Sequence, residues 1–493
     1  MKSCTKIPFL LPTLVAALGL MLAGRATAQT FTTLHRFLYG DGVAPQGGLI
    51  LSGNTLYGTA SAGGNSGGVN GNGTLFAINI INQGFTNLYS FTSDGSPYYT
   101  NSDGANPQAD LILSGNVLYG TTSEGGTNGA GTVFAISSNG TNFTVLHTFT
   151  GGNDGGGPYG GLTLSGTNLY GTTDYGGSSG YGTVFAVNTI GTVFTNLYNF
   201  TNGTDGCNPL GGLILSGNRL YGTTSGGNGG GFGSVFAINT DGTGFTNLHS
   251  FTANSGYPTY TNRDGSGPEA GLVLAGNTLY GTASQSGVHG AGTIFAVNTN
   301  GKGFTNLYYF AATSGSPPTN SDGAVPRGGL ILAGSTLYGT AYNGGLFASG
   351  TLFGINTNGT GFTNLYNFTF DSVYPYTNGD GSHPNAGLIL SDNTLYGTAT
   401  GGGYYQVGFA ANGTVFSFTL ASVSLPLLAI NPSGTDVILT WPTNATGFTL
   451  ESTTNLVPPA VWITNSTAPF VVNTNNAVTN GITGTQQFYR LSQ

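Results

Sequence analysis

Charged side chains are scarce in this chain of 493 residues. Asp, Glu, Lys and Arg together make up 5% of it, whereas roughly a quarter of a typical soluble domain is charged. The nine Lys and Arg residues are outnumbered by 17 Asp and Glu residues, and the formal net charge is −8. Nucleic acids and anionic membrane surfaces are bound through clusters of cationic side chains. The composition therefore argues against both as partners of this protein.

Cysteine and long apolar runs are also rare. Only Cys4 and Cys207 are present, and the one long apolar stretch is 9–24, which follows two lysines and precedes Ala-Thr-Ala at 26–28. This combination predicts a secretory signal peptide at 1–28; the alternative is an uncleaved membrane anchor, for which the stretch is short. Cleavage removes Cys4, so no internal disulfide is expected. We expect a protein that is secreted or held at the cell surface, with no membrane span after cleavage.

Glycine, in contrast, is abundant, with 88 residues. Such richness can indicate disorder, but the apolar and aromatic residues recur at fixed positions, so we expect the glycines to separate short strands. The segment Leu-Tyr-Gly-Thr occurs seven times, at spacings of 51 to 62 residues, which is the length of a four-stranded propeller blade. Its tyrosines are Tyr57, Tyr119, Tyr170, Tyr221, Tyr280, Tyr338 and Tyr396.

Each copy contains four strand-like segments, typified by GLILSG, TLYGT, GTVFAIN and GFTNLYNF. The first three types occur seven times, but the fourth follows only the first six copies, and its seventh example, FTTLHRF, stands before the array at 31–37. An N-terminal strand that completes the last blade would close a ring and cover an exposed edge. The sequence therefore predicts an all-β fold: a seven-bladed β-propeller over residues 29–420, closed by the N-terminal strand.

The connections between these strands fall into two groups. Those from the first to the second strand and from the third to the fourth are short. Those from the second to the third strand, and from one blade to the next, are long and differ between copies, as at 92–109 and 252–270. Variable loops on a rigid scaffold are the usual place of function. We therefore expect the functional face at the long-loop end of the propeller.

The repeat resembles two known families. The segment LYGTTSGG at 220–227 is similar to the kelch strand that ends in Gly-Gly, although the outer strand begins with Phe where kelch has Trp. The segments AINTDGTGFTNLHSF at 237–251 and GGLILSGN at 211–218, with Asp-Gly and Pro between such units, more closely resemble the Gloeo/Verruco tandem repeat of exported bacterial proteins. The resemblance covers roughly 31–420. It implies export and a repeat architecture, and no particular reaction.

Residues 424–493 differ from the repeats. They contain the only two tryptophans, Trp441 and Trp462, and short alternating segments such as DVILTWP at 436–442. They resemble the small fibronectin-III-like modules at the C-termini of secreted bacterial proteins. This resemblance implies a small β-sandwich-like domain after the propeller.

The sequence Asp-Gly-x-x-Pro precedes the first strand of every copy. In one interpretation the Asp side chain caps its own turn, Gly takes a positive φ and Pro sets the strand entry. In the other, a ring of carboxylates binds calcium or a polyol. A ligand site is rarely needed seven times, so the structural interpretation is favoured. The aspartates are Asp41, Asp103, Asp154, Asp205, Asp264, Asp322 and Asp380.

The five histidines do not form a metal-binding pattern. His35, His147 and His249 replace a tyrosine of the fourth strand, so we expect them to pack as aromatic residues. His289 and His383 lie in separate loops without the spacing of a zinc site. No metal site is predicted.

The candidate catalytic side chains are equally isolated in sequence. Cys207 has no neighbouring base that would make it a nucleophile. Glu124 and Glu269 both lie in long loops and could form a carboxylate pair of the glycosidase type, but neither lies in a recognisable motif. No catalytic residue and no cofactor is predicted.

The long loops also carry tyrosines that are candidates for ligand binding. Flat aromatic faces with amide and hydroxyl neighbours can bind sugar rings or a protein partner. The alternative is that they pack over neighbouring blades and stiffen glycine-rich loops. These residues are Tyr98, Tyr99, Tyr257, Tyr260, Tyr374, Tyr376, Tyr404 and Tyr405.

The leading hypothesis is a secreted or cell-surface, non-enzymatic binding or envelope module. Its long-loop face would recognise a polysaccharide or a cell-envelope protein. The runner-up is a carbohydrate-active enzyme, a hydrolase or lyase, with carboxylates at the mouth of the propeller channel. A third hypothesis is a purely structural surface protein. The sequence does not indicate an oligomeric state.

Overall fold

The structure is a computed structural model in which two compact units are present, Thr30–Thr419 and a second unit that contains Leu420–Gln493. The described residues are 29–64, 71–93, 100–227, 232–253, 261–369, 378–403, 412–421, 428–433, 436–443, 448–454, 461–465, 467–473, 475–481 and 487–492. The predicted signal peptide at 1–28 lies outside them. Over the described ranges the secondary structure consists of β-strands, and no helix there is long and apolar enough to cross a membrane.

The described part of the larger unit contains seven four-stranded antiparallel sheets, numbered here 1 to 7 in chain order. Sheet 1 is β2 (Ile50–Ser52), β3 (Thr55–Ala60), β4 (Thr74–Asn79) and β5 (Phe85–Ser90); sheet 2 is β6 (Ile112–Ser114), β7 (Val117–Thr122), β8 (Thr132–Ser137) and β9 (Thr144–Thr148); sheet 3 is β10 (Thr163–Ser165), β11 (Asn168–Thr173), β12 (Thr183–Asn188) and β13 (Phe194–Asn199). Sheet 4 is β14 (Ile214–Ser216), β15 (Arg219–Thr224), β16 (Ser234–Asn239) and β17 (Thr246–Ser250); sheet 5 is β18 (Val273–Ala275), β19 (Thr278–Ala283), β20 (Thr293–Asn298) and β21 (Thr305–Tyr309). Sheet 6 is β22 (Ile331–Ala333), β23 (Thr336–Ala341), β24 (Thr351–Asn356) and β25 (Thr363–Asn367); sheet 7 is β26 (Ile389–Ser391), β27 (Thr394–Ala399), β28 (Thr414–Thr419) and β1 (Thr30–Arg36).

The N-terminal strand β1 completes sheet 7. It pairs antiparallel with β28, from Thr30 opposite Thr419 to Arg36 opposite Thr414, with a register shift between Thr33 and His35. The outer strands of the other six sheets are supplied by the strand that follows in sequence. The count of strand types predicts this pairing, because only the N-terminus offers a fourth strand to the last copy.

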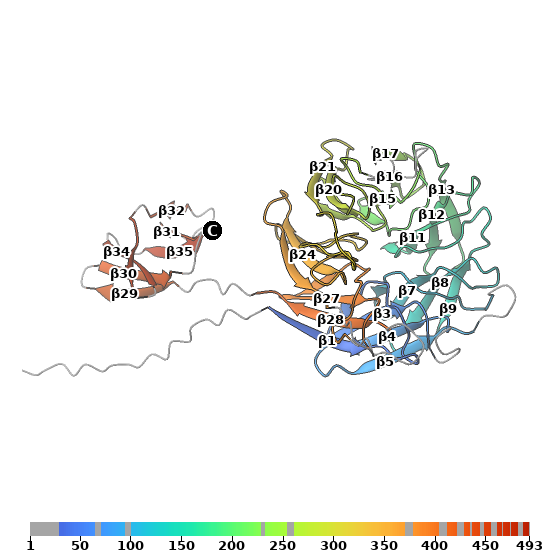
Figure 1. Cartoon of the computed structure of the whole chain (residues 1–493), viewed down its shortest axis with the longest axis horizontal. Coiled ribbons are helices and arrows are strands. Elements are labelled where there is room, and N and C mark those ends of the chain that lie inside the picture. The colour runs from blue at the N-terminus through green and yellow to red at the C-terminus, as the bar shows by residue number, and fades with distance from the viewer. Residues whose placement is uncertain are drawn as a thin grey trace, which may run out of the picture. The chain divides into compact units, whose positions relative to one another are not determined.

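Phenylalanines fill every interface between neighbouring sheets. The ring of Phe251, which follows the fourth strand of sheet 4, lies edge-on to Phe295 of sheet 5 at 5.3 Å, and burial of one such side chain stabilises the fold by about 1.5–3 kcal/mol. The same edge-on pair recurs as Phe37–Phe76, Phe91–Phe134, Phe149–Phe185, Phe200–Phe236, Phe310–Phe353 and Phe368–Phe416. The contacts return from sheet 7 to sheet 1, and the sheets follow one another around a ring (Figure 1).

The Leu-Tyr-Gly-Thr segment has a structural role at the same interfaces. In sheet 1, Leu56 is fully buried, and a Cβ atom at Gly58 would come within 2.8 Å of the Leu49 side chain. Thr59 donates a hydrogen bond from Oγ1 to the carbonyl oxygen of Ala109, at 3.1 Å, in the loop that enters sheet 2. The equivalent bonds are Thr121–Gly160, Thr172–Gly211, Thr223–Ala270, Thr282–Gly328, Thr340–Ala386 and Thr398–Gly47.

The almost wholly apolar first segments, typified by GLILSG, are typical of strands buried on both faces, but the innermost strands differ from this expectation. Each spans only three residues, and Ile50 in sheet 1 and Ile112 in sheet 2 are half-buried. The reason is that each of these strands is the edge strand of its sheet and lines a central cavity, so no further strand covers its inner edge. The described part of the larger unit thus has an all-β, β-propeller-like fold.

The second unit contains two small antiparallel sheets. One is β29 (Ala429–Ser433), β30 (Asp436–Pro442), β34 (Asn475–Gly481) and β33 (Phe470–Val472), and the other is β32 (Ile463–Thr464), β31 (Thr449–Thr453) and β35 (Phe488–Ser492). Leu439, Trp441 and Val478 of the first sheet pack with Leu450 of the second in one core. Trp462 instead lies against Arg490, whose guanidinium carbon is 4.3 Å from its ring centre.

Candidate functional site at the mouth of the central cavity

All eight tyrosines predicted to bind a ligand lie outside the described residues. They are Tyr98, Tyr99, Tyr257, Tyr260, Tyr374, Tyr376, Tyr404 and Tyr405. The site described below is therefore built from other residues at the same end of the sheets, where the chain passes from one sheet to the next.

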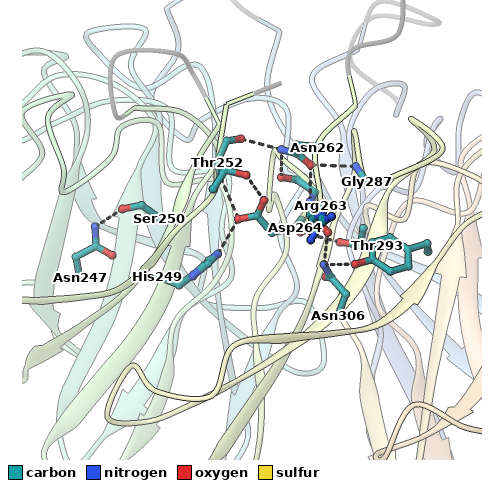
Figure 2. A network of polar contacts seen from close by, with 12 residues as sticks. Asn247, His249, Ser250, Thr252, Asn262, Arg263, Asp264, Gly287, Thr293 and Asn306 are labelled. Atoms are coloured by element: carbon teal, nitrogen blue, oxygen red, sulfur yellow. Dashed lines mark hydrogen bonds and ion pairs between the residues drawn. The ribbon is translucent and has the colours of Figure 1, made fainter. Parts of the chain in front are cut away.

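The Asp-Gly-x-x-Pro segment forms a polar network between sheets, shown for Asp264 in Figure 2. His249 at the outer strand of sheet 4 lies with Nε2 3.1 Å from Oδ2 of Asp264, and Thr252 donates to the same carboxylate from its backbone N–H and its hydroxyl. Thr293 of sheet 5 donates to the Asp264 carbonyl oxygen at 3.2 Å. Burial by itself would raise the pKa of Asp264, but the hydrogen bonds from His249 and Thr252 outweigh it and hold the pKa below its ordinary value.

The same carboxylate contact is made in every sheet. In three sheets the partner is histidine and in four it is tyrosine: His35–Asp41, Tyr89–Asp103, His147–Asp154, Tyr198–Asp205, His249–Asp264, Tyr308–Asp322 and Tyr366–Asp380. Burial, and then the neighbouring carboxylate, raises the pKa of Tyr198 to about 12. The ring also stacks on a phenylalanine of the next sheet, as His147 does on Phe194 at 3.8 Å. The histidines are thus packed aromatic residues that also pair with aspartate, a contact that the sequence analysis did not foresee.

Glycine and proline of the segment fix the chain against the preceding sheet. Gly265 has a φ of 89°, as the turn interpretation requires, and a Cβ atom at Gly233 would lie 2.5 Å from Cδ of Pro268. The other six glycine–proline contacts are Gly73–Pro107, Gly131–Pro158, Gly182–Pro209, Gly292–Pro326, Gly350–Pro384 and Gly413–Pro45. Within the described ranges no group of three or more His, Cys, Asp or Glu side chains is placed to hold a metal ion. Each aspartate thus takes part in contacts between neighbouring sheets.

The residue after this proline is different in nearly every copy, although its neighbours repeat. The seven residues are Gln46, Gln108, Tyr159, Leu210, Glu269, Arg327 and Asn385. All are half-buried, and all line one cavity of about 910 Å³ at the centre of the larger unit. Binding sites for small molecules occupy cavities of about 300–1,000 Å³ with a few convergent polar groups. We call these seven residues the mouth ring.

One side of the mouth is acidic and aromatic. Tyr159 and Asp174 both line the cavity, and the carboxylates of Asp174 and Glu124 are close enough to raise the pKa of Tyr159, after the larger effect of burial. A Cβ atom at Gly157 would lie 2.9 Å from the Tyr175 ring and 3.2 Å from the Tyr159 ring, so the two rings flank this glycine.

Asp110 is the most unusual residue that lines the cavity. The other six copies have glycine at its position, namely Gly48, Gly161, Gly212, Gly271, Gly329 and Gly387. Its carboxylate accepts a hydrogen bond from the Gly48 N–H. Asp110 is exposed to solvent in the cavity, and desolvation by the surrounding protein raises the pKa of its carboxyl group despite the bond from Gly48. Burial raises the pKa of Asp174 in the same way, and hydrogen bonding from Asn208 opposes the shift.

Elsewhere on the mouth ring, an acidic and a basic side chain form an ion pair. Glu269 lies 3.4 Å from Nε of Arg327 and accepts a hydrogen bond from Ser284 at 2.9 Å. The Arg327 guanidinium lies 4.7 Å from the centre of the Tyr342 ring. The His383 ring also packs against Tyr342, with the two ring centres 4.9 Å apart, and burial lowers the pKa of His383.

The remaining candidates do not form a catalytic group. Glu269 is paired with Arg327, whereas the side chain of the exposed Glu124 accepts a hydrogen bond from Asn106 at 3.3 Å, so each glutamate has its own partners. Cys207 is buried, and burial followed by the charges of Asp174 and Asp205 raises the pKa of its thiol. A thiol with a raised pKa is a poor nucleophile. His289 is exposed in the β19–β20 loop.

Sequence reasoning missed the mouth ring, but the signal was present. One variable position lies between an invariant proline and a small residue in all seven copies. A repeated scaffold needs the same residue at equivalent positions, so a position that varies while its neighbours do not indicates a role outside the scaffold.

No curated protein matches this sequence. Three solved structures are similar in fold: a Mycobacterium tuberculosis puromycin-hydrolysing peptidase (11% identity, 82% of this chain and 58% of that chain, TM-score 0.43), a Vibrio parahaemolyticus oligogalacturonate lyase (12%, 80% and 94%, 0.45) and a Niastella koreensis GH74 enzyme (14%, 84% and 59%, 0.45). This chain therefore spans less than two thirds of the peptidase and of the GH74 enzyme. With TM-scores below 0.5, these likenesses carry no weight for activity.

The sequence also matches the Gloeobacter/Verrucomicrobia repeat twice in tandem, at residues 96–262 and 258–437. These two matches together cover well over half of the chain, and they include most of the repeats whose sheets form the ring. The chain belongs to the Gloeobacter/Verrucomicrobia repeat family.

Proposed function

We propose that this protein is an exported, non-enzymatic binding module that recognises a carbohydrate at the mouth of its central cavity. In this proposal the seven sheets are the blades of a seven-bladed propeller closed by β1, residues 1–28 are a signal peptide, and residues 424–493 form a fibronectin-III-like domain. A protein ligand from the cell envelope is the alternative within the same binding function.

The observation that carries the proposal is the mouth ring. Seven equivalent positions around one cavity hold six different kinds of side chain, on a scaffold whose other contacts repeat in every sheet. Amide side chains such as Gln108 and Asn385 can donate hydrogen bonds to hydroxyl groups and accept hydrogen bonds from them. The ring of Tyr159 offers a flat face for a sugar.

Screening of the purified protein on a glycan array, followed by calorimetric titration of the best glycan, tests this function. The variants Tyr159→Ala and Asn385→Ala should each weaken binding at least fivefold, because they remove a stacking face and an amide from the mouth. The matched control is Asn300→Ala in the short turn between β20 and β21, which should bind as the wild type does. Absence of any glycan ligand, or variants that bind unchanged, would contradict the proposal.

The second candidate is a carbohydrate-active enzyme. Asp110 and Asp174 favour it, because both line the cavity and burial raises the pKa of both carboxyl groups, and shifted carboxyl pKa values are common in active sites. Release of reducing ends or of unsaturated products from a polysaccharide panel, lost in Asp174→Asn, would establish this candidate in place of binding alone.

A further inference from the structure

We propose that the carbohydrate is an extended neutral polysaccharide, which leaves the cavity at sheet 3 and stacks on a second subsite formed by Tyr175 and Tyr181. This inference rests on the proposed function and narrows its ligand class to a chain of several sugar rings. The cavity of about 910 Å³ has the size that encloses a drug-sized molecule. A longer chain therefore has to continue outside the mouth.

The loop between β11 and β12, at 174–182, carries two exposed aromatic rings. Tyr175 is 39% and Tyr181 is 38% exposed, and together with Phe347 (43%) they are the most exposed tyrosines and phenylalanines of the described larger unit. An accessible tyrosine offers a flat apolar face to a ring and a hydroxyl group to a hydrogen-bond partner. The loop thus presents two faces on which sugar rings can stack.

A pair of glycines holds the ring of Tyr175 in place. A Cβ atom at Gly156 would lie 2.5 Å from Cε2 of Tyr175, and one at Gly157 would lie 2.9 Å from its Cε1, so the ring lies against backbone that has no side chain. The backbones of Gly156 and Tyr175 also exchange two hydrogen bonds, at 3.0 and 3.2 Å. A ring that is already fixed loses little conformational entropy when a ligand binds to it.

These features occur together in one copy of the repeat. Tyr175 is the only aromatic residue at its position, and only this copy has two successive glycines at the position of 156–157. Tyr159 of the mouth ring belongs to the same copy, and the position of Tyr181 is aromatic in only one other copy, as Phe232. A need of the scaffold would recur in every copy, so three tyrosines at one end of one copy indicate a role outside the scaffold.

Both exposed tyrosines are connected to residues that line the cavity. Tyr175 and Tyr159 flank Gly157, whose added Cβ atom would lie 3.2 Å from the Tyr159 ring. Asn208 donates a hydrogen bond from its backbone N–H to the carbonyl oxygen of Tyr181, at 3.0 Å. Tyr159 and Asn208 line the cavity. The second subsite is therefore continuous with the mouth.

Polar side chains border the two rings. Ser178 and Ser179 are exposed on the same loop, and Asp174 lines the cavity directly before Tyr175. Serine hydroxyls can donate hydrogen bonds to sugar hydroxyls and accept them, and a carboxylate can accept them. The segments 156–159 and 174–182 contain no lysine or arginine. A neutral chain therefore fits these residues better than an acidic one.

The test titrates the full protein calorimetrically with oligosaccharides of two and six units from cellulose, mannan and xylan. We expect at least one hexamer to bind at least tenfold more tightly than its dimer, because only the hexamer reaches from the cavity to the second subsite. Equal affinities of dimer and hexamer, or no binding of any hexamer, would overturn this inference. Carbohydrate binding as such would stand if another glycan of the array still binds.

Two variants locate the gain at the second subsite. Tyr175→Gln and Tyr181→Ala should each lower the affinity for the hexamer at least fivefold, and with it the ratio between hexamer and dimer. Glutamine and alanine are native at the equivalent positions, as Gln285 and Ala130, so both variants suit the scaffold. Tyr175→Phe keeps the ring and should keep the affinity. An unchanged ratio in Tyr175→Gln and Tyr181→Ala would refute the second subsite.

The matched control is Phe347→Ala, which removes an equally exposed ring from the equivalent loop of sheet 6. It should keep the hexamer affinity, which separates a local subsite from general adhesion to exposed aromatic residues. A loss in this control as large as in the tyrosine variants would also count against the inference. An envelope protein that binds through the two tyrosines, with no hexamer bound, would overturn the sugar assignment. Binding of no glycan on the array would instead contradict the proposed function.

Discussion

Thr398 donates a hydrogen bond from its hydroxyl to the carbonyl oxygen of Gly47, at 3.1 Å and across 351 positions of sequence. The same bond joins every other pair of neighbouring sheets, for example Thr172 to Gly211 at 3.2 Å. At the junction between the last sheet and the first, the chain therefore uses the same contact as at its internal junctions.

Replacement of Thr398 by valine should cost as much stability as replacement of Thr172 by valine. Both threonines are buried, with 2% and 1% of their surface exposed, and each substitution leaves a buried carbonyl oxygen without its donor, at a cost of about 1–3 kcal/mol. Urea unfolding of the two variants measures this. A Thr398→Val variant as stable as the wild type, beside a destabilised Thr172→Val, would show that the ring is open in solution.

Deletion of residues 29–38 should destabilise the whole larger unit. The deletion removes the outer strand of sheet 7 together with Phe37, which is fully buried, and Phe31, whose ring stacks on Tyr366 at 4.1 Å. Loss of a buried phenylalanine side chain alone costs about 3–5 kcal/mol. Thermal unfolding of the truncated protein should show a clearly lower Tm. The point variant Leu38→Ala is the control, since this residue is 42% exposed; an unchanged Tm of the truncated protein would refute closure by β1.

Ala44→Asn should stabilise the protein by about 0.5–1 kcal/mol. Ala44 has a φ of 53°, a left-handed conformation that asparagine adopts more readily than alanine. Asparagine occupies the equivalent positions 106 and 208, with φ values of 62° and 54°. Chemical unfolding compares the variant with Ala62→Asn, a neighbouring position without positive φ. A gain in both variants, or in neither, would speak against strain at position 44.

The buried histidines should make the folded state less stable in weak acid. Burial outweighs the aspartate partners and lowers the pKa of His35 and His147 below the ordinary value of 6.5. The folded state then binds fewer protons than the unfolded state, so stability is present at neutral pH and is lost as the pH falls through about 6.5 towards the lower folded pKa.

The double variant His35→Tyr, His147→Tyr should lose less stability than the wild type between pH 7.5 and pH 5.5. Tyrosine makes the same contact with aspartate in four sheets, for example between Tyr308 and Asp322 at 2.8 Å, and carries no charge in this range. Unfolding curves at several pH values measure the difference, with the exposed His289→Gln as control. An identical pH profile in the double variant and the wild type would count against this account.

Cys207 should resist alkylation in the folded protein. It is 7% exposed, and burial raises the pKa of its thiol, so little reactive thiolate forms near neutral pH. In a Cys4→Ser background, labelling by iodoacetamide at pH 8 should be at least tenfold slower in buffer than in denaturant. Similar rates in the two conditions would place Cys207 at an accessible surface.

Much of the scaffold could be predicted because it is repeated. The all-β fold and the membership of the Gloeobacter/Verrucomicrobia repeat family are confirmed, and β1 pairs with β28 as the count of strand types predicts. The bond between aspartate and an outer-strand ring was missed. It could have been inferred, because that position holds tyrosine or histidine and never phenylalanine, which means that a polar atom is needed there.

The candidate site was less predictable. The sequence predicted the site at tyrosines of the long loops, which lie outside the described part of the chain. The mouth ring instead consists of single positions, each next to a proline that recurs in every copy. Its members are separated by about one repeat length each, and nothing local in the sequence indicates that Glu269 pairs with Arg327 or that Asp110 shares a cavity with Asp174.

The sequence by itself determined the strands, their order and the contacts that repeat, because alternating apolar residues, glycines at tight positions and a matching set of strand types act locally or between adjacent copies. Tertiary structure decided which variable side chains meet. Packing of the phenylalanines between sheets sets the curvature of the ring, and this curvature brings the starts of all the innermost strands to one central cavity. Side chains that are about fifty residues apart in sequence line the same cavity there. Their charges can act on one another only in the folded protein, where the separation is short.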